Sequence, residues 1–78
     1  MTLDDLRNKI DSIDNQVLDL LNNRMQVVKQ VGELKRASNA IIYRPEREKA
    51  IIDRLEKMNN GLLSRAAIEA IFLEVFAV

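Results

Sequence analysis

Neither cysteine nor histidine occurs in this chain. Their absence excludes disulfides, thiol nucleophiles, imidazole acid–base catalysis and zinc sites built from these two residue types. Any catalysis must therefore use carboxylates, lysine, arginine, hydroxyls or backbone groups. We expect no metal site and no cofactor.

The chain also lacks an excess of charge of either sign, because 12 Lys and Arg balance 12 Asp and Glu. This balance predicts no general attraction to nucleic acid or to an anionic membrane. No apolar run approaches the roughly 20 residues that span a bilayer, and polar residues follow Met1 directly. With 47% apolar and 31% charged residues, we expect a globular protein of the cytoplasm.

Glycine and proline are absent from residues 1–31, so nothing in this stretch interrupts a helix. Apolar residues recur there at steps of three and four, which is typical of a long helix that packs against other helices. We call these positions the α-stripe: Leu3, Leu6, Ile10, Ile13, Val17, Leu20, Val27, Val31 and Leu34.

The ends of this first helix are also indicated. Thr2 followed by Asp5 predicts a capping box at its start, and we expect it to reach about Lys35 or Ala37. The alternative is a break at residues 22–23, since asparagine is unfavourable inside a helix. The continuous helix is favoured, because the apolar phase carries through that point.

The length of this helix predicts a second copy of the chain. At about 1.5 Å per residue it measures about 50 Å, whereas a compact domain of this size is roughly 30 Å across. Part of its apolar surface therefore needs cover from another chain, and we infer an obligate helical dimer.

Two shorter helices are predicted in the second half. Pro45 suits the first position of one helix, Gly61 is available for a left-handed turn after it, and Ser64 can cap the other. Their apolar positions are Ile51, Ile52, Leu55 and Met58, then Ile68, Ile71, Phe72, Val75 and Phe76. Because the last helix stops in full apolar phase at Val78, we expect it to be truncated there. The fold class is all-α, with three helices in one domain over residues 1–78.

A cation interrupts the α-stripe, since Arg24 stands where an apolar residue is expected between Leu20 and Val27. Lys35 comes eleven residues later, so the two point in directions only about 20° apart, about 16 Å along the axis. Both side chains can converge on one small ligand. Arg7 is about 25 Å from Arg24 and about 100° around the helix. It can reach such a site only from a partner chain.

A second pair of candidates opens the helix after Pro45. Arg47 and Glu48 lie four residues before Ile51 and Ile52, so both should face the core. Taken alone, each is explained by an ion pair at the core edge, and Arg24 likewise by a buried salt bridge. Together they leave an inward excess of positive charge, which favours a site for a small polyanion such as a dicarboxylate. We interpret the remaining cations as solvated: Lys9, Lys29, Arg36, Lys49, Arg54, Lys57 and Arg65. Arg44 is ambiguous, because the helix dipole disfavours a cation there.

Four segments carry a resemblance to a known family: LRNKIDSID at 6–14, LLNNR at 20–24, VGELK at 31–35 and YRPERE at 43–48. Combined at this spacing, they resemble the all-helical chorismate mutases over nearly the whole chain. The last segment is most similar to the mutase domain fused ahead of prephenate dehydratase in bifunctional enzymes. The resemblance implies an isomerase that forms an intertwined homodimer and converts chorismate to prephenate in phenylalanine and tyrosine biosynthesis.

The same resemblance implies roles for five side chains. Arg24 would bind one substrate carboxylate, and Arg7 of the other chain the second. Lys35 would hydrogen-bond the ether oxygen, Glu48 the ring hydroxyl, and Arg47 would support that end of the site. The family also places a serine and a glutamine or glutamate further along the third helix, beyond Val78.

Two alternatives remain open from the sequence. An isochorismate-pyruvate lyase has the same fold and a similar pericyclic mechanism, although residues 44–48 favour the mutase. A non-catalytic helical dimerisation or regulatory domain would use the same cations structurally.

Overall fold

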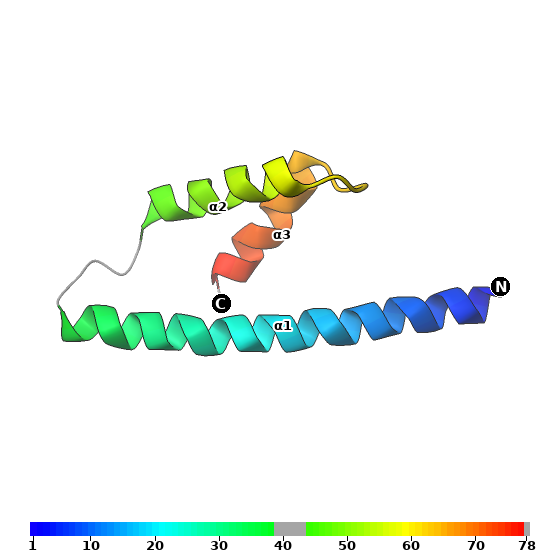
Figure 1. The fold of residues 1–78 in the computed structure, drawn as a ribbon, viewed down its shortest axis with the longest axis horizontal. Helices are drawn as coiled ribbons and strands as arrows, with labels where there is room; N and C mark the ends of the chain where they lie inside the picture. Colours follow the sequence, from blue (N-terminus) through cyan, green and yellow to red (C-terminus); the bar gives the residue numbers. More distant parts are fainter. Residues whose placement is uncertain (39–43, 78) are drawn as a thin grey trace. The chain divides into compact units, whose positions relative to one another are not determined.

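The computed structural model describes residues 1–38 and 44–77, and all its regular structure is helical (Figure 1). The elements are α1 (Leu3–Ala37), α2 (Pro45–Met58) and α3 (Arg65–Ala77), with no strand among the described residues. This confirms the all-α prediction with a long first helix. Along the same two ranges, no helix is both long and apolar enough to cross a bilayer. Tyr43 and Val78, used in the predictions above, lie outside the described residues.

The chain divides into two units, Met1–Ala37 and Ser38–Val78. The first unit is α1, a single uninterrupted helix of 35 residues, which confirms the continuous helix over the alternative of a break at residues 22–23. Its start is the predicted capping box: the Asp5 amide donates to Thr2 Oγ1 at 3.1 Å, and the Thr2 amide donates to Asp5 Oδ2 at 3.0 Å. The two bonds satisfy amide groups that otherwise lack intrahelical acceptors.

The α-stripe has no cover within the first unit, since α1 buries none of the residues Leu3–Ala37. Side chains of the stripe are between 43% exposed at Leu6 and 73% exposed at Leu34. Helices in water owe most of their stability to packing of such a stripe rather than to intrinsic propensity. The sequence therefore forms α1 locally but leaves its apolar face for other elements to cover.

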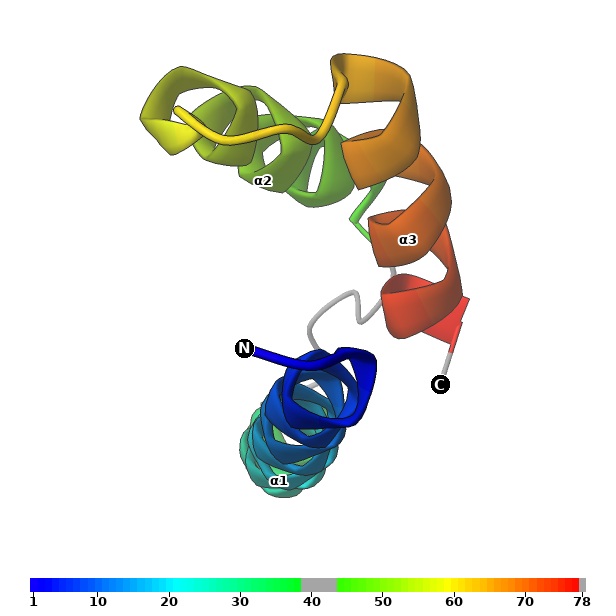
Figure 2. The ribbon, with the colours of Figure 1, turned by 90° about the vertical axis from the view of Figure 1, so that its right-hand side faces the viewer.

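The second unit is a pair of helices with a small core. Proline at the start of α2 fits the first turn, where its missing amide proton is not needed. α3 turns back obliquely from the end of α2 (Figures 1 and 2), and the two helices pack on each other. Their core is Ile51, Ile52 and Ile68, which are 8%, 6% and 5% exposed. Met58 and Ile71, also predicted inward, are 66% and 49% exposed, because α2 and α3 cross at an angle and meet over only part of their lengths.

The link between α2 and α3 is held by an asparagine rather than by a glycine turn. α2 ends at Met58, and Asn59 follows in an extended conformation at φ −74° and ψ 120°. Its side chain accepts a bond from the Gly61 amide at 3.1 Å and donates to the Leu63 carbonyl at 2.6 Å. Gly61 is not in the left-handed region, so that prediction is wrong. The predicted cap of α3 is confirmed, since the Ala67 amide donates to Ser64 Oγ at 3.1 Å.

Candidate functional site

Arg24 and Lys35 lie on one face of α1. Because α1 runs without a break from Leu3 to Ala37, the helical geometry predicted from the sequence applies: a separation of about 16 Å along the axis and of about 20° in direction. Both residues are half-buried, whereas the apolar α-stripe on the same helix is exposed. Two long cationic side chains thus share one face of a rigid element.

Arg7 does not join them. It is exposed in the N-terminal part of α1, and seventeen residues of continuous helix separate it from Arg24, which corresponds to about 25 Å. A small ligand held by Arg24 and Lys35 is out of reach of the Arg7 on the same helix.

Glu48 is half-buried in the first turns of α2. It lines a hollow of about 280 Å³ between α2 and α3. Apolar side chains from both helices form part of its wall, including Ile52, Leu73 and Phe76. A carboxylate at the edge of this hollow, whose lining is part apolar and part charged, can accept a hydrogen bond from a ligand.

Arg47 is exposed, so the prediction that it faces the core of its own chain is wrong. The residues of α2 that line the hollow are Pro45, Glu48, Lys49 and Ile52. Arg47 points about 100° away from Glu48, off the face that meets α3.

The cation of Arg44 is paired at the start of α2. Its Nε donates to Glu46 Oε1 at 2.6 Å, which offsets the unfavourable field of the helix dipole on a cation at this end. The Arg44 carbonyl accepts bonds from the amides of Arg47 and Glu48 at 3.0 and 3.3 Å. Arg44 therefore shapes the turn that carries Glu48, through its backbone.

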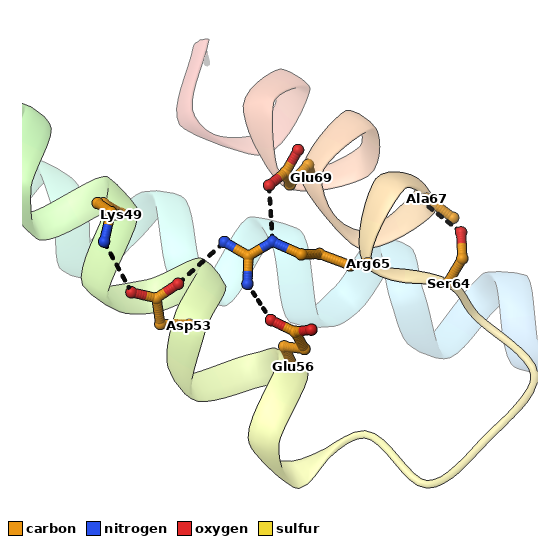
Figure 3. Close-up of polar contacts among 7 residues, drawn as sticks. All are labelled: Lys49, Asp53, Glu56, Ser64, Arg65, Ala67 and Glu69. Carbon is orange, nitrogen blue, oxygen red and sulfur yellow. Dashed lines mark hydrogen bonds and ion pairs between the residues drawn. The ribbon is translucent and has the colours of Figure 1, made fainter.

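Arg65 joins α2 to α3, a role that was not predicted from the sequence (Figure 3). Its Nη2 donates to Asp53 at 2.9 Å, its Nη1 pairs with Glu56, and its Nε donates to Glu69 at 3.0 Å. The interpretation of Arg65 as solvated agrees with a side chain that is 40% exposed, but its ion pairs were not predicted. Only the Arg65–Glu69 pair, four residues apart on one helix, could be inferred from spacing. The contacts with Asp53 and Glu56 depend on how the two helices pack.

These contacts shift the pKa values of Asp53 and Arg65. The hydrogen bond from Arg65, followed by that from Lys49, lowers the pKa of the Asp53 carboxyl below its ordinary value. The Lys49 bond is 3.3 Å long. In return, the bonds to Asp53 and then Glu69 raise the pKa of the Arg65 guanidinium. Both shifts favour the charged forms, so the cluster is an ion-pair network at neutral pH.

The chemistry open to this arrangement is the binding of anions and hydroxyls. α1 offers guanidinium and ammonium groups, and the hollow of the second unit offers two half-buried carboxylates, Glu48 and the Arg65-paired Glu69. Among residues 1–38 and 44–77, no three Asp or Glu side chains are grouped so as to hold a metal ion. The groups present suit electrostatic stabilisation and orientation of a small dianion more than nucleophilic attack.

Comparisons with known proteins agree on one family. The family described as chorismate mutase type II matches residues 6–78. The bifunctional chorismate mutase/prephenate dehydratase of Neisseria gonorrhoeae is 41% identical over 80 residues, covering 97% of this chain and 22% of that protein. The chorismate mutase of Methanocaldococcus jannaschii is 45% identical over 56 residues, covering 72% of this chain and 57% of that protein.

A solved structure is also similar. The chorismate mutase of Thermus thermophilus aligns with a TM-score of 0.93 and 28% identity, over 96% of this chain and 94% of that one. The chain spans only about a fifth of the length of the bifunctional relatives it matches.

Proposed function

Because the chain belongs to the chorismate mutase type II family, we propose that it catalyses the rearrangement of chorismate to prephenate in the biosynthesis of phenylalanine and tyrosine. The observation that carries this proposal is the placement of Arg24 and Lys35 on one face of the continuous helix α1. The matching family is described as chorismate mutase type II, so the activity proposed here is the mutase alone.

The chemistry explains why cations suffice. The reaction is a unimolecular Claisen rearrangement that needs no base, nucleophile or metal. The enzyme must hold a flexible dianion in a compact chair form, which is an effect of orientation. It must also stabilise negative charge that develops on the ether oxygen as the carbon–oxygen bond breaks. A preorganised cation in a site shielded from water does this efficiently.

In this proposal each α1 cation has a separate task. Arg24 binds one carboxylate of the substrate, and Lys35 donates to the ether oxygen. Arg7 of a second copy binds the other carboxylate, since the Arg7 on the same helix is about 25 Å away from Arg24. The active site is therefore shared between two chains.

The second unit completes the site. Glu48, half-buried at the hollow, accepts a hydrogen bond from the ring hydroxyl of the substrate. Arg47 is exposed on the neighbouring face of α2. In the proposed dimer it supports the end of the site that binds the ring hydroxyl. Both units of the chain then form one mutase domain over residues 1–78.

Dimensions support the homodimer. The α-stripe extends over about 46 Å, whereas the 14 residues of α2 and the 13 of α3 make helices of only about 20 Å each. Wherever this pair lies, it leaves part of the stripe uncovered, and a second α1 has the matching length.

Charge supports an antiparallel pairing of the two long helices. Residues 3–23 carry five carboxylates and two cations, whereas residues 24–37 carry four cations and one carboxylate. An antiparallel pair places opposite charges together, which favours this orientation over the parallel one.

The experiment mixes two inactive variants. Purified protein is assayed spectrophotometrically for loss of chorismate and formation of prephenate. Arg7→Ala and Arg24→Ala should each be nearly inactive as homodimers. After exchange of chains, heterodimers contain one site with both arginines, so part of the activity should return.

Two results would overturn the proposal. No rescue in mixtures with demonstrated chain exchange excludes the shared site. Formation of pyruvate and a salicylate-type product from isochorismate, without prephenate from chorismate, assigns the protein to the lyase chemistry instead.

A further inference from the structure

We propose that Arg65 is a positioning residue for Glu48: by tying α3 to α2, it fixes the hollow in which that carboxylate meets the substrate. This inference rests on the proposed function, because it concerns the ring-hydroxyl end of the mutase site. Arg65 is not itself placed in contact with the reacting atoms.

The guanidinium of Arg65 is held on three sides (Figure 3). Two of its nitrogens bind Asp53 and Glu56, which stand one turn apart on α2, and the third binds Glu69 on its own helix. A planar guanidinium held at all three nitrogens has little freedom to rotate. Arg65 therefore restricts both the distance and the relative rotation of α2 and α3.

The hollow connects this ion-pair network to Glu48. Arg65 and Glu69 line the same hollow as Glu48, on the side formed by α3. Ile52, one turn after Glu48 on α2, also lines it and is 6% exposed. A shift of α3 on α2 would thus move the wall opposite Glu48 and alter the solvation and reach of its carboxylate.

Charge explains why α3 would shift without Arg65. Asp53, Glu56 and Glu69 all face the one guanidinium. Its removal leaves three carboxylates close together, and Lys49 remains bonded to Asp53. Like charges at this spacing repel, and the buried core that opposes this repulsion consists of three isoleucines among the described residues.

A purely structural role for Arg65 predicts something different. It would lower the thermal midpoint but leave kcat/KM unchanged in the folded protein at low temperature. A positioning role changes kcat/KM in protein that is folded and dimeric, and the change depends on Glu48.

The test compares four variants at a temperature where circular dichroism and gel filtration show folded dimer: Arg65→Ala, Arg65→Lys, Glu48→Gln, and Arg65→Ala combined with Glu48→Gln. Arg54→Ala is the matched control, because Arg54 is an exposed arginine of α2 whose side chain donates to the Met58 sulfur at 3.5 Å.

We expect Arg65→Ala to lower kcat/KM by about tenfold to a hundredfold, the range for a small misplacement of a substrate-contacting group. Arg65→Lys should recover part of this loss, and Arg54→Ala should stay within about twofold of wild type. In the Glu48→Gln background, the Arg65→Ala substitution should cost less than about twofold, since it acts through Glu48.

The inference is overturned if Arg65→Ala lowers only the thermal midpoint, or if its effect is equally large with and without Glu48. Should Arg65→Ala fail to fold, Asp53→Asn weakens the same network by one ion pair and takes its place. Wild-type protein that forms no prephenate overturns the proposed function itself, whereas active wild type with an unaffected Arg65→Ala variant overturns only this inference.

Discussion

The two units of this chain differ in how far they bury their own apolar side chains. α1 is the longest element, with 35 residues, yet it buries none of the residues Leu3–Ala37. The α2–α3 pair is shorter, yet it contains the buried core of Ile51, Ile52 and Ile68 and the ion-pair network of Arg65. One unit has an apolar face to offer to other elements, and the other holds its own two helices together.

The cations of the two units also differ in what they bind. In the second unit, Arg65 forms ion pairs with Asp53, Glu56 and Glu69 of the same unit. On α1, Arg24 and Lys35 share a half-buried face, which the proposed function assigns to the substrate. We infer that α1 carries the dimer contacts and most of the substrate contacts, whereas the packed pair of α2 and α3 holds Glu48 in position.

The largest effect is expected from a charge placed in the α-stripe. It distinguishes apolar residues that a second chain covers from those buried within one chain. Ile13 is 57% exposed in the single chain, so a carboxylate there costs little unless a second chain covers it. In the proposed dimer, Ile13→Asp leaves an unpaired buried charge, which costs about 3–5 kcal/mol. Analytical ultracentrifugation should show monomers, and activity should be lost with them.

The controls for this prediction lie in both units. Asn15→Asp adds the same charge to α1 away from the stripe and should leave the dimer intact. Ile68→Ala removes a core side chain that is 5% exposed and should reduce stability by about 2–5 kcal/mol while the folded protein stays dimeric. An active dimeric Ile13→Asp variant would contradict the assignment of the α-stripe to the interface.

Next in size is the loss of the α1 ammonium group. Lys35→Ala should lower turnover by about 10²–10³, the typical loss for one donor to a developing oxyanion. Stability and the dimer should be unchanged, because Lys35 is only half-buried and lies at the end of α1. Steady-state kinetics and gel filtration measure both.

Lys29→Ala is the matched control, since Lys29 is an exposed lysine of α1 about 120° around the helix from Lys35. It should retain full turnover. Near-normal turnover in Lys35→Ala would remove Lys35 from the proposed role and weaken the division of tasks between the two units.

The smallest expected effect is the pH dependence of the second unit. The pKa of Asp53 is lowered, chiefly by the bond from Arg65. Near pH 4 the unfolded chain therefore binds more protons than the folded one, and stability rises with pH there. The contribution is complete above the ordinary aspartate pKa of about 3.9 and is lost as pH falls through the lowered one.

Thermal unfolding between pH 3 and pH 7 measures this contribution. The difference in midpoint between wild type and Asp53→Asn should be constant near neutrality and shrink below about pH 4. The raised pKa of Arg65 keeps that residue charged throughout this range. Arg65→Ala should remove most of the same dependence of stability on acid pH. A difference in midpoint between wild type and Asp53→Asn that stays constant down to pH 3 would contradict the assignment to Asp53.

Local features were predictable because they depend on residues close in sequence. The capping box of Thr2 and Asp5, the cap by Ser64 and the start of α2 at Pro45 all follow from contacts within one turn. The continuity of α1 follows from the absence of glycine and proline before Gly32. For the same reason, the shared face of Arg24 and Lys35 required no tertiary information.

The wrong predictions have another origin. Arg47 and Met58 continue the apolar spacing of α2, but spacing does not reveal which part of the stripe the next helix covers. Gly61 could have formed a left-handed turn, yet the side chain of Asn59 bonds to the link instead. Each outcome was decided by contacts that compete with local preference.

The sequence by itself thus determined the three helices, most of their ends, and the spacing of the cations on α1, since helical geometry converts residue numbers directly into directions and distances. Only the tertiary structure decided which side chains of α2 and α3 are buried and that Arg65 binds Asp53 and Glu56 across the two helices. Such contacts depend on the crossing of two helices, which side-chain packing sets and no local pattern specifies.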